Sequence, residues 1–295
     1  MLKRPLVVAE IGCNHRGDAA TAADMVTAAA DCGADFVKFQ KRHIPSMPEL
    51  KRNAPHPNPH NAYGDTYGEH RQALELTADD HKALAQAAEE LGITAFTSVW
   101  DVASAEEMAP VYPEHLKVPS ACNTDRALVS YLADDYGGTI HLSLGMTTRH
   151  EEERVMRLLY CKDRLCDTVI YHSTSGYPIE PKDACLLEIQ RLRATYGIDC
   201  KAVGYSGHHN GIALDLTAFA MGAQIIERHF TLDRTWKGTD HAASLEPAGL
   251  TKLVRDLGAA GQAMTFKSGV LECEEANRKK LKEAVSGKFS GSSAT

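Results

Sequence analysis

The sequence has no long hydrophobic run, and this absence excludes several classes of protein. None of its apolar segments approaches the roughly 20 residues that cross a bilayer, and the early segment PLVVA is too short for a secretory signal peptide. We therefore expect a cytoplasmic protein with no membrane association. The chain also has no stripe of Lys and Arg with interleaved aromatics, and its formal net charge is −7, so nucleic-acid binding has no electrostatic basis.

Paired cysteines and a glycine-rich nucleotide motif are also missing. The eight cysteines are scattered and form no C-x-x-C motif, which argues against a zinc knuckle and a disulfide framework. What the 295 residues do have is globular composition, 43% hydrophobic and 24% charged, with length for a large core. These features are typical of a small-molecule enzyme.

Short β-branched runs alternate with segments of helical periodicity along the chain. The runs cover residues 6–11, 35–40, 93–100, 115–120, 139–145, 167–173, 201–206 and 223–230. Amphipathic segments such as 18–34, 77–92 and 211–223 lie between them. Eight βα units in this length predict an α/β fold, a TIM (β/α)8 barrel formed as a single domain by residues 1–270. A doubly wound sheet is the alternative, but no G-x-G-x-x-G motif opens one.

Polar side chains stand at or just after the end of every predicted strand. They are Glu10, Lys38 with Gln40, Ser98, Lys117 with Ser120, Ser143, His172 with Ser173, Ser206 with His208, and His229. In a TIM barrel the carboxyl ends of the strands build the active site. One polar residue can simply begin a loop, but eight strand ends together indicate a site.

The residue types at these ends suggest a chemistry. Two lysines and several hydroxyls suit a ligand that carries both a phosphate and a carboxylate, as phosphoenolpyruvate does. His208, His229 and Glu10 lie on neighbouring strands and could form a site for Mn²⁺, Mg²⁺ or Zn²⁺. The alternative for each histidine is a hydrogen-bonded residue at the rim.

Six segments carry a family resemblance. In chain order they are AEIGCNHRGD, GADFVKFQK, TYGEHRQALELT, HSTSGYP, GYSGHHNGIAL and IIERHFTLDRTWKGTDHAASLEP. They resemble the N-acetylneuraminate (sialic acid) synthase family, most closely its animal, sugar-phosphate-using branch. The resemblance implies a TIM-barrel transferase that forms a C–C bond. It would condense phosphoenolpyruvate with the open-chain aldehyde of an N-acylmannosamine, or its 6-phosphate, and release phosphate and a 2-keto-3-deoxy sugar acid.

The resemblance also implies roles for the residues that match. The phosphoenolpyruvate cradle would comprise Lys38, Ser98, Lys117, Ser120, Ser143 and Ser206, and the sugar contacts Gln40, Tyr177 and Asp240. His208 and His229 resemble the metal ligands, for Mn²⁺ first and Mg²⁺, Co²⁺ or Zn²⁺ otherwise. Glu10 would complete this group by holding a water beside the metal and taking its proton.

An unusually long connection, residues 41–76, separates the second and third predicted strands. Loops of this length in compact domains are usually functional or disordered. Because TYGEHR within it matches the family, we expect a lid over the sugar. Candidates for contacts to a sugar 6-phosphate are the basic residues of this connection, with Lys237 from the last loop: Lys41, Arg42, Lys51, Arg52 and Arg71. For most of these residues the alternative is a charged side chain exposed to solvent.

Two departures from the family pattern bear on the acceptor. The family has an acidic residue two positions after KVPS, where this chain has Cys122. One explanation is that Asp125 or another carboxylate takes the catalytic role of the missing acidic residue. Alternatively, the acceptor aldehyde differs from N-acetylmannosamine, or the reaction has changed. Cys122 could also be a small hydrophobic residue without a catalytic role. Residues 271–295 are expected to be a tail without the family's antifreeze-like domain, which supplies an arginine to the partner subunit's sugar site. We expect a homodimer, or a separate protein that replaces this domain.

Two other functions stay open at this point. An aldolase for a different aldehyde would use Lys38 or Lys117 to form a Schiff base. A non-catalytic relative would bind the ligands without turnover.

Overall fold

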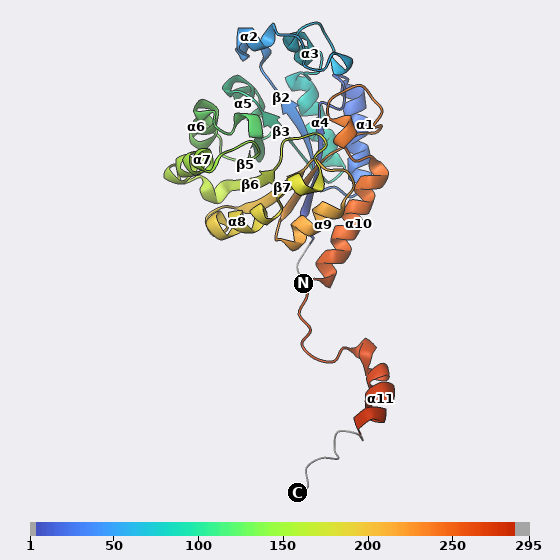
Figure 1. Ribbon diagram of the computed structural model, residues 1–295. Helices are drawn as coiled ribbons and strands as arrows, with labels where there is room; N and C mark the ends of the chain where they lie inside the picture. The colour runs from blue at the N-terminus through green and yellow to red at the C-terminus, as the bar shows by residue number, and fades with distance from the viewer. Residues whose placement is uncertain (1–3, 287–295) are drawn as a thin grey trace.

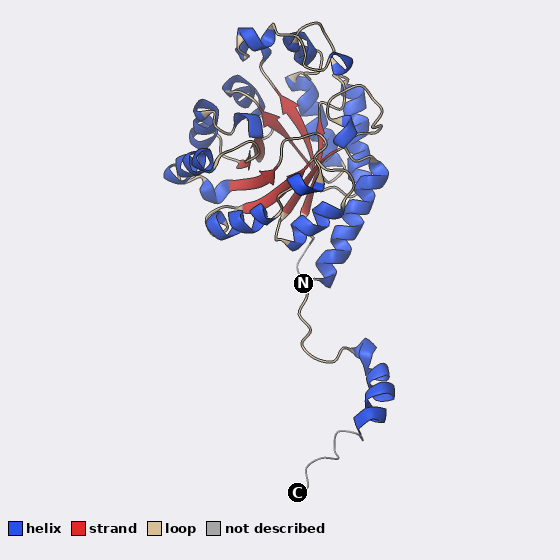
Figure 2. Cartoon of the chain, in the orientation of Figure 1, coloured by secondary structure: helices blue, strands red, loops and turns tan. Residues whose placement is uncertain are grey.

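The protein is a closed barrel of eight parallel strands in the order β1 to β8, as the computed structural model of residues 4–286 shows (Figures 1 and 2). The strands are β1 Leu6–Gly12, β2 Phe36–Lys41, β3 Thr94–Val99, β4 His115–Val118, β5 Thr139–Ser143, β6 Thr168–Ser173, β7 Ala202–Gly207 and β8 Ile225–His229. The predicted TIM barrel is confirmed, and every strand end agrees with the sequence prediction to within two residues.

Helices surround the strands on the outside of the barrel (Figure 2). They are α1 Ala19–Asp31, α4 Ala78–Glu90, α5 Val102–Met108, α6 Arg126–Asp135, α7 Arg149–Cys161, α8 Leu187–Tyr196, α9 Ala213–Ala220 and α10 Pro247–Ala263. Several begin at a side-chain cap, because Asp18, Thr77 and Thr148 accept hydrogen bonds from the otherwise unpaired N–H groups of the first turn. These caps fix where each loop at the mouth of the barrel ends.

Alternation along the strands divides the buried residues into two sets. Outward-facing residues such as Val7, Ala9 and Ile11 pack under the helices in the main core. Inward-facing residues form a second cluster at the base of the barrel, with Val8, Phe96, Val169, Tyr171 and Ile225. Nearer the mouth than this apolar layer, the inward-facing positions carry charged side chains. The polar groups of the site therefore pack on an apolar layer.

The connection between β2 and α4 is ordered into short helices. It contains η1 Ile44–Ser46, α2 Glu49–Arg52, η2 Pro59–Asn61 and α3 Tyr67–Gln72, and lies beyond the carboxyl end of β2 (Figure 1). The Tyr63 hydroxyl donates a hydrogen bond of 2.6 Å to the Lys237 carbonyl, which joins this segment to the loop after β8. The segment therefore spans two sides of the mouth, as a lid would.

Part of the predicted tail, residues 271–295, is helical. Residues Glu272–Ser286 form a helix, α11, that stands apart from the barrel (Figure 1). Residues 287–295, also assigned to the tail, lie outside the described residues. Among residues 4–286, no helix combines the length and apolarity that crossing a bilayer requires. All eight cysteines are free thiols.

Candidate active site

Four buried charged residues of alternating sign form the base of the mouth. Lys117 on β4 places Nζ 2.7 Å from both carboxylate oxygens of Glu227 on β8. Lys38 on β2 places Nζ 2.6 Å from Glu10 Oε2 on β1 and 3.8 Å from Glu227 Oε1. Each of the four is at most 4% exposed. Buried charges are costly unless they are paired, and each charge in this row has a partner of opposite sign. The two ammonium groups can also attract an anionic ligand.

Glu227 lines the cavity and pairs with Lys117, but the sequence did not single it out as a site residue. It lies two positions before His229 on β8, so both side chains face the barrel interior. Arg228 between them faces outward and forms a buried ion pair with Asp215 on α9. The period-2 alternation of the strand could have revealed Glu227, which lies inside the strand and not at its end.

The pKa values in this row follow from burial and from the neighbouring charges. Burial lowers the pKa of Lys117 to about 8, with Lys38 adding to the effect and Glu227 opposing it. Burial also disfavours charge on Lys38, but Glu10 and Glu227 outweigh it and raise its pKa. For Glu227, burial is outweighed by Lys117 and Lys38, so its pKa is lowered.

The lowered pKa of Lys117 predicts a pH dependence. Below about pH 8 the side chain is an ammonium that can bind an anion, and above it the side chain is increasingly neutral. We expect kcat/KM for an anionic substrate to fall about tenfold per pH unit above this value. Lys117→Arg should abolish this alkaline limb, because guanidinium stays charged. A limb that persists unchanged in Lys117→Arg would assign the titration to another group.

Hydroxyl groups line the same cavity. Ser98 accepts a hydrogen bond of 2.9 Å from Lys38 Nζ, and Ser206 donates one of 3.1 Å to Glu227 Oε1. The Gly145 N–H donates to Ser120 Oγ at 3.1 Å. All six residues predicted for the phosphoenolpyruvate cradle line this cavity of about 230 Å³ at the carboxyl ends of the strands: Lys38, Ser98, Lys117, Ser120, Ser143 and Ser206.

Two imidazoles face each other across this cavity, with ring centroids 5.4 Å apart. His208 Nδ1 lies 2.7 Å from the Thr174 carbonyl, so Nδ1 carries the proton and Nε2 keeps a lone pair. His229 Nδ1 is buried and has no hydrogen-bond partner within residues 4–286; it lies 3.9 Å from Asp240 Oδ2. A backbone carbonyl behind one imidazole nitrogen is typical of a metal-binding histidine, so this pair fits a divalent cation.

Glu10 stands beside this pair but is held by other partners. Its Oε1 accepts a hydrogen bond of 3.0 Å from Gln40 Nε2, and its Oε2 pairs with Lys38. Gly12, two residues after Glu10, has a φ of 57°, and a Cβ there would lie 3.0 Å from Gln40 Nε2. A side chain at this position would therefore crowd the Gln40 amide that holds Glu10. Among the described residues no group of three or more His, Cys, Asp or Glu is arranged to hold a metal. The ligand group of Glu10, His208 and His229 therefore stays a prediction, with only the imidazole pair directly supported by local geometry.

Four predicted residues do not line the cavity. Asp125 is exposed and caps α6 by accepting from the Ala127 and Leu128 N–H groups, and its catalytic role stays a prediction. Cys122 is half-buried, its Sγ donates to the Trp100 carbonyl, and burial raises its pKa to about 11. Asp240 stands behind His229, and Lys237 is exposed on the loop after β8. Gln40 and Tyr177 do line the cavity, as predicted.

Some polar residues near the strand ends have structural roles instead. Asn14 donates to the Phe230 carbonyl and to Ser244 Oγ, and His15 Nδ1 accepts from the Gly17 N–H, so both secure the loop after β1. His172 Nε2 bonds the Ala184 carbonyl. The cavity lining also includes residues that the sequence analysis did not single out: Trp100, Pro119, Ala121, Met146, Ser175 and Glu227.

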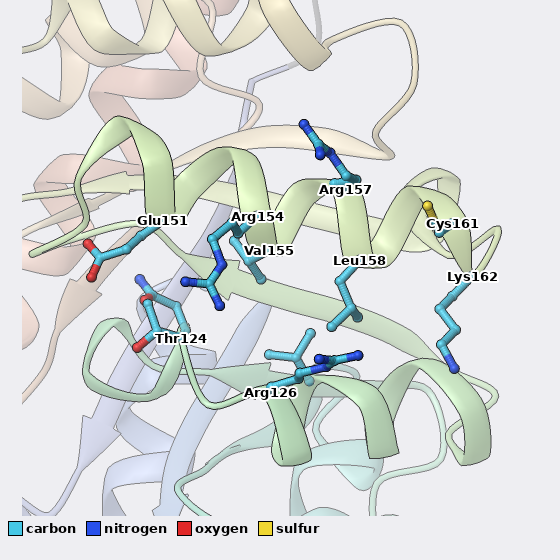
Figure 3. A pocket seen from close by; sticks show the side chains of 11 residues that line it. Thr124, Arg126, Glu151, Arg154, Val155, Arg157, Leu158, Cys161 and Lys162 are labelled. Atoms are coloured by element: carbon cyan, nitrogen blue, oxygen red, sulfur yellow. The ribbon is translucent and has the colours of Figure 1, made fainter.

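A larger cavity of about 410 Å³ lies on the outside of the barrel, between α6 and α7 (Figure 3). Val129, Val155 and Leu158 contribute apolar side chains, and Arg126 and Arg154 flank it. None of the predicted site residues lines it. Its residues come from helices rather than strand ends, so the smaller cavity at the mouth is the candidate active site.

The barrel and the polar cavity at its mouth are those of a TIM-barrel enzyme. The chain belongs to the NeuB family, whose model matches residues 25–268. It is 36% identical over 288 residues to the N-acetylneuraminate-9-phosphate synthase of Mus musculus, covering 96% of this chain and 77% of that protein. It is 32% identical over 283 residues to the N,N'-diacetyllegionaminic acid synthase of Campylobacter jejuni, covering 95% of this chain and 83% of that protein.

Solved structures of other proteins have the same barrel fold as this chain. The N-acetylneuraminic acid synthetase of Leptospira borgpetersenii, crystallised with citrate, superposes with a TM-score of 0.79 at 28% identity, covering 95% of this chain and 93% of that one. A truncated 3-deoxy-D-arabino-heptulosonate 7-phosphate synthase from Thermotoga maritima shares the fold, with a TM-score of 0.64 at 14% identity over 88% of this chain and 87% of that one.

Proposed function

We propose that the protein condenses phosphoenolpyruvate with an open-chain aldose and releases phosphate and a sialic-acid-like 2-keto-3-deoxy sugar acid. The observation that carries the proposal is the buried row of Lys38, Lys117 and Glu227, lined by serine hydroxyls at the mouth. Phosphoenolpyruvate carries a carboxylate and a phosphate, and two ammonium groups with directional hydroxyls match both. The related proteins named above are an N-acetylneuraminate-9-phosphate synthase and an N,N'-diacetyllegionaminic acid synthase.

The side chains divide the chemistry between them. Lys38 and Lys117 bind the anionic groups of phosphoenolpyruvate, and their carboxylate partners keep both charged and oriented. Glu10, fixed by Gln40 and Lys38, is placed to accept a proton from the water that adds to C2. Tyr177 packs on the His208 ring, at 4.2 Å between centroids, and closes the acceptor side.

A divalent metal would bind at His208 and His229, and we propose Mn²⁺. When bound, it polarises the acceptor aldehyde as a Lewis acid. The acceptor we propose is an N-acylmannosamine, its 6-phosphate or a related aldose. We assign residues 1–270 to the synthase barrel, of which residues 1–3 lie outside the described part of the chain, and residues 41–76 to its lid. We further propose that the protein acts in the cytoplasm as a homodimer.

A Schiff-base aldolase is the second candidate, because the lowered pKa of Lys117 also suits an amine nucleophile. The two functions differ in their covalent chemistry. Borohydride treatment in the presence of substrate would trap a reduced adduct on Lys117 only in the aldolase.

One assay tests the proposed function. Purified, metal-stripped protein is incubated with phosphoenolpyruvate, Mn²⁺ and a panel of aldoses with and without a 6-phosphate, while phosphate release and product mass are followed. We expect turnover with at least one aldose, Mn²⁺ dependence and a product mass equal to aldose plus pyruvate. Phosphoenolpyruvate binding without phosphate release across the panel would contradict a synthase, and a borohydride-trapped adduct would favour the aldolase.

A further inference from the structure

Tyr171 on β6 contacts the Lys117 ammonium with the face of its ring. Lys117 Nζ lies 4.3 Å from the centroid of the Tyr171 ring, and both side chains are at most 2% exposed. The quadrupole of an aromatic ring attracts a cation that lies over its face within about 6 Å of the centroid, and the attraction is stronger where water is excluded. Lys117 therefore has an uncharged partner in addition to Glu227.

Contacts from three other strands hold the Tyr171 ring in place. The Tyr171 hydroxyl lies 2.8 Å from Nδ1 of His141 on β5. His141 Nε2 lies 3.0 Å from Nδ1 of His115, the first residue of β4, so the three rings form a chain toward the amino end of the barrel. Gly204 on β7 leaves room for the ring, because a Cβ there would lie 2.7 Å from both Cδ1 and Cε1 of Tyr171.

The three rings of this chain are uncharged in the pH range where Lys117 titrates. Burial lowers the pKa of His141 well below its usual value, and the charges of His115 and Lys117 add to this effect. Burial also lowers the pKa of His115. Burial raises the pKa of Tyr171 well above its usual value, and Glu227 adds to this effect. The chain therefore contributes no titration of its own near pH 8, where Lys117 loses its proton.

Charged groups from three other strands also act on Lys117. Burial lowers the pKa of Lys117 to about 8, Glu227 on β8 raises it, Lys38 on β2 lowers it and Glu10 on β1 raises it. An anion that binds Lys117 competes with Glu227, because both accept hydrogen bonds from the same ammonium. The Tyr171 ring does not compete for these hydrogen bonds. It can therefore keep Nζ in place while Glu227 shares the ammonium with a ligand.

We propose that Tyr171 is a positioning residue for Lys117, and that the face of its ring, anchored by His141, holds the ammonium where it binds the anionic substrate. This inference rests on the proposed role of Lys117 in phosphoenolpyruvate binding. Tyr171 does not line the catalytic cavity, so it acts through Lys117 and not by touching the substrate.

Two substitutions separate the ring of Tyr171 from its hydroxyl. Tyr171→Leu and Tyr171→Phe both remove the bond to His141, but only Tyr171→Phe keeps an aromatic face. The neighbours of Tyr171 at the base of the barrel include Phe96 and Val169, so the space left by leucine is apolar and should stay dry. The loss of the ring is then not replaced by water around Nζ.

The alkaline limb of kcat/KM for phosphoenolpyruvate is the main readout. In Tyr171→Leu we expect this limb to move about half to one unit lower in pH, because the contact that favours the charged amine is lost. The KM for phosphoenolpyruvate, measured below the limb, should rise about three- to tenfold. In Tyr171→Phe both quantities should stay close to those of the wild-type protein. An unchanged limb in Tyr171→Leu, or equal shifts in the two variants, would overturn the inference.

Tyr112 offers a matched control. Its hydroxyl lies 2.9 Å from His81 Nδ1, and it is 3% exposed, so it is also a buried tyrosine that bonds a histidine. It packs in the main core and not at the base of the barrel. Tyr112→Leu should lower the melting temperature without moving the limb, and the same shift in this variant would refute a specific role of Tyr171. If Tyr171→Leu does not fold, Tyr171→Met, which fills more of the space without an aromatic face, should give the same shift.

A direct titration separates this inference from the proposed function. In protein labelled with nitrogen-15 at lysine Nζ, the NMR signal of Lys117 is assigned by its loss in Lys117→Arg. With no substrate present, this signal should titrate about half to one pH unit lower in Tyr171→Leu than in the wild-type protein. An identical titration would refute the positioning role. Absence of phosphate release with phosphoenolpyruvate bound would contradict the condensation alone, because the titration does not depend on turnover.

Discussion

Lys117→Met is expected to reduce kcat/KM for phosphoenolpyruvate about 1,000-fold. In the structure this ammonium lies 2.7 Å from both oxygens of Glu227 and faces the cavity that contains the other proposed phosphoenolpyruvate contacts. Two charge-assisted hydrogen bonds to the substrate, at roughly 2 kcal/mol each, correspond to that loss. Steady-state phosphate release measures it, and a loss below about tenfold would exclude Lys117 from substrate binding.

The same substitution should also destabilise the fold, because it removes the nearest cation from the buried Glu227 carboxylate and leaves Lys38 at 3.8 Å and the Ser206 hydroxyl at 3.1 Å. Breaking a buried ion pair costs about 3–5 kcal/mol, whereas replacing both partners by apolar residues is often neutral. The double variant Lys117→Met with Glu227→Leu should therefore regain much of the stability in urea unfolding, yet remain inactive. Recovery of activity together with stability would show that the pair is only structural.

Glu152 provides the matched control on the outside of the barrel. It is buried and ion-paired, with its Oε2 2.7 Å from Arg191 Nη2 and 3.2 Å from Arg149 Nη1. Glu152→Gln should lower stability without changing kcat/KM. The comparison separates the general cost of breaking a buried pair from the specific loss of the Lys117 charge.

The barrel could be predicted because its signal is local. Each strand is a short apolar run, and each ends where a polar residue begins the mouth, so the positions of Lys38, Lys117 and Ser206 follow from counting along the strands. Closure into a barrel then brings distant strand ends together without further information. Glu227 escaped only because it lies inside its strand rather than at the end.

The roles of loop residues could not be predicted in the same way. Asp125 and Asp240 are both carboxylates in loops after strands, yet one caps a helix and the other stands 3.9 Å from His229. The sequence alone does not distinguish a buried basic side chain from one exposed to solvent. It therefore predicts the same sugar-phosphate contact for Arg42, which is buried, and for Lys51, which is exposed. Burial and the partners of each side chain depend on packing between segments far apart in the chain.

His208→Ala and His229→Ala are each expected to abolish turnover, by about 1,000-fold or more, and to weaken Mn²⁺ binding. The His208 ring is oriented by the Thr174 carbonyl and faces His229, so each variant leaves one imidazole, too few for a tight site. His209→Ala is the control, because this adjacent ring bonds Arg228 on the outside of β8 and should affect stability alone. Electron paramagnetic resonance of Mn²⁺ and phosphoenolpyruvate binding by calorimetry give the readouts. Undiminished Mn²⁺ affinity in both variants, with turnover lost, would mean that the imidazoles act on the substrate directly and that the metal, if required, binds elsewhere.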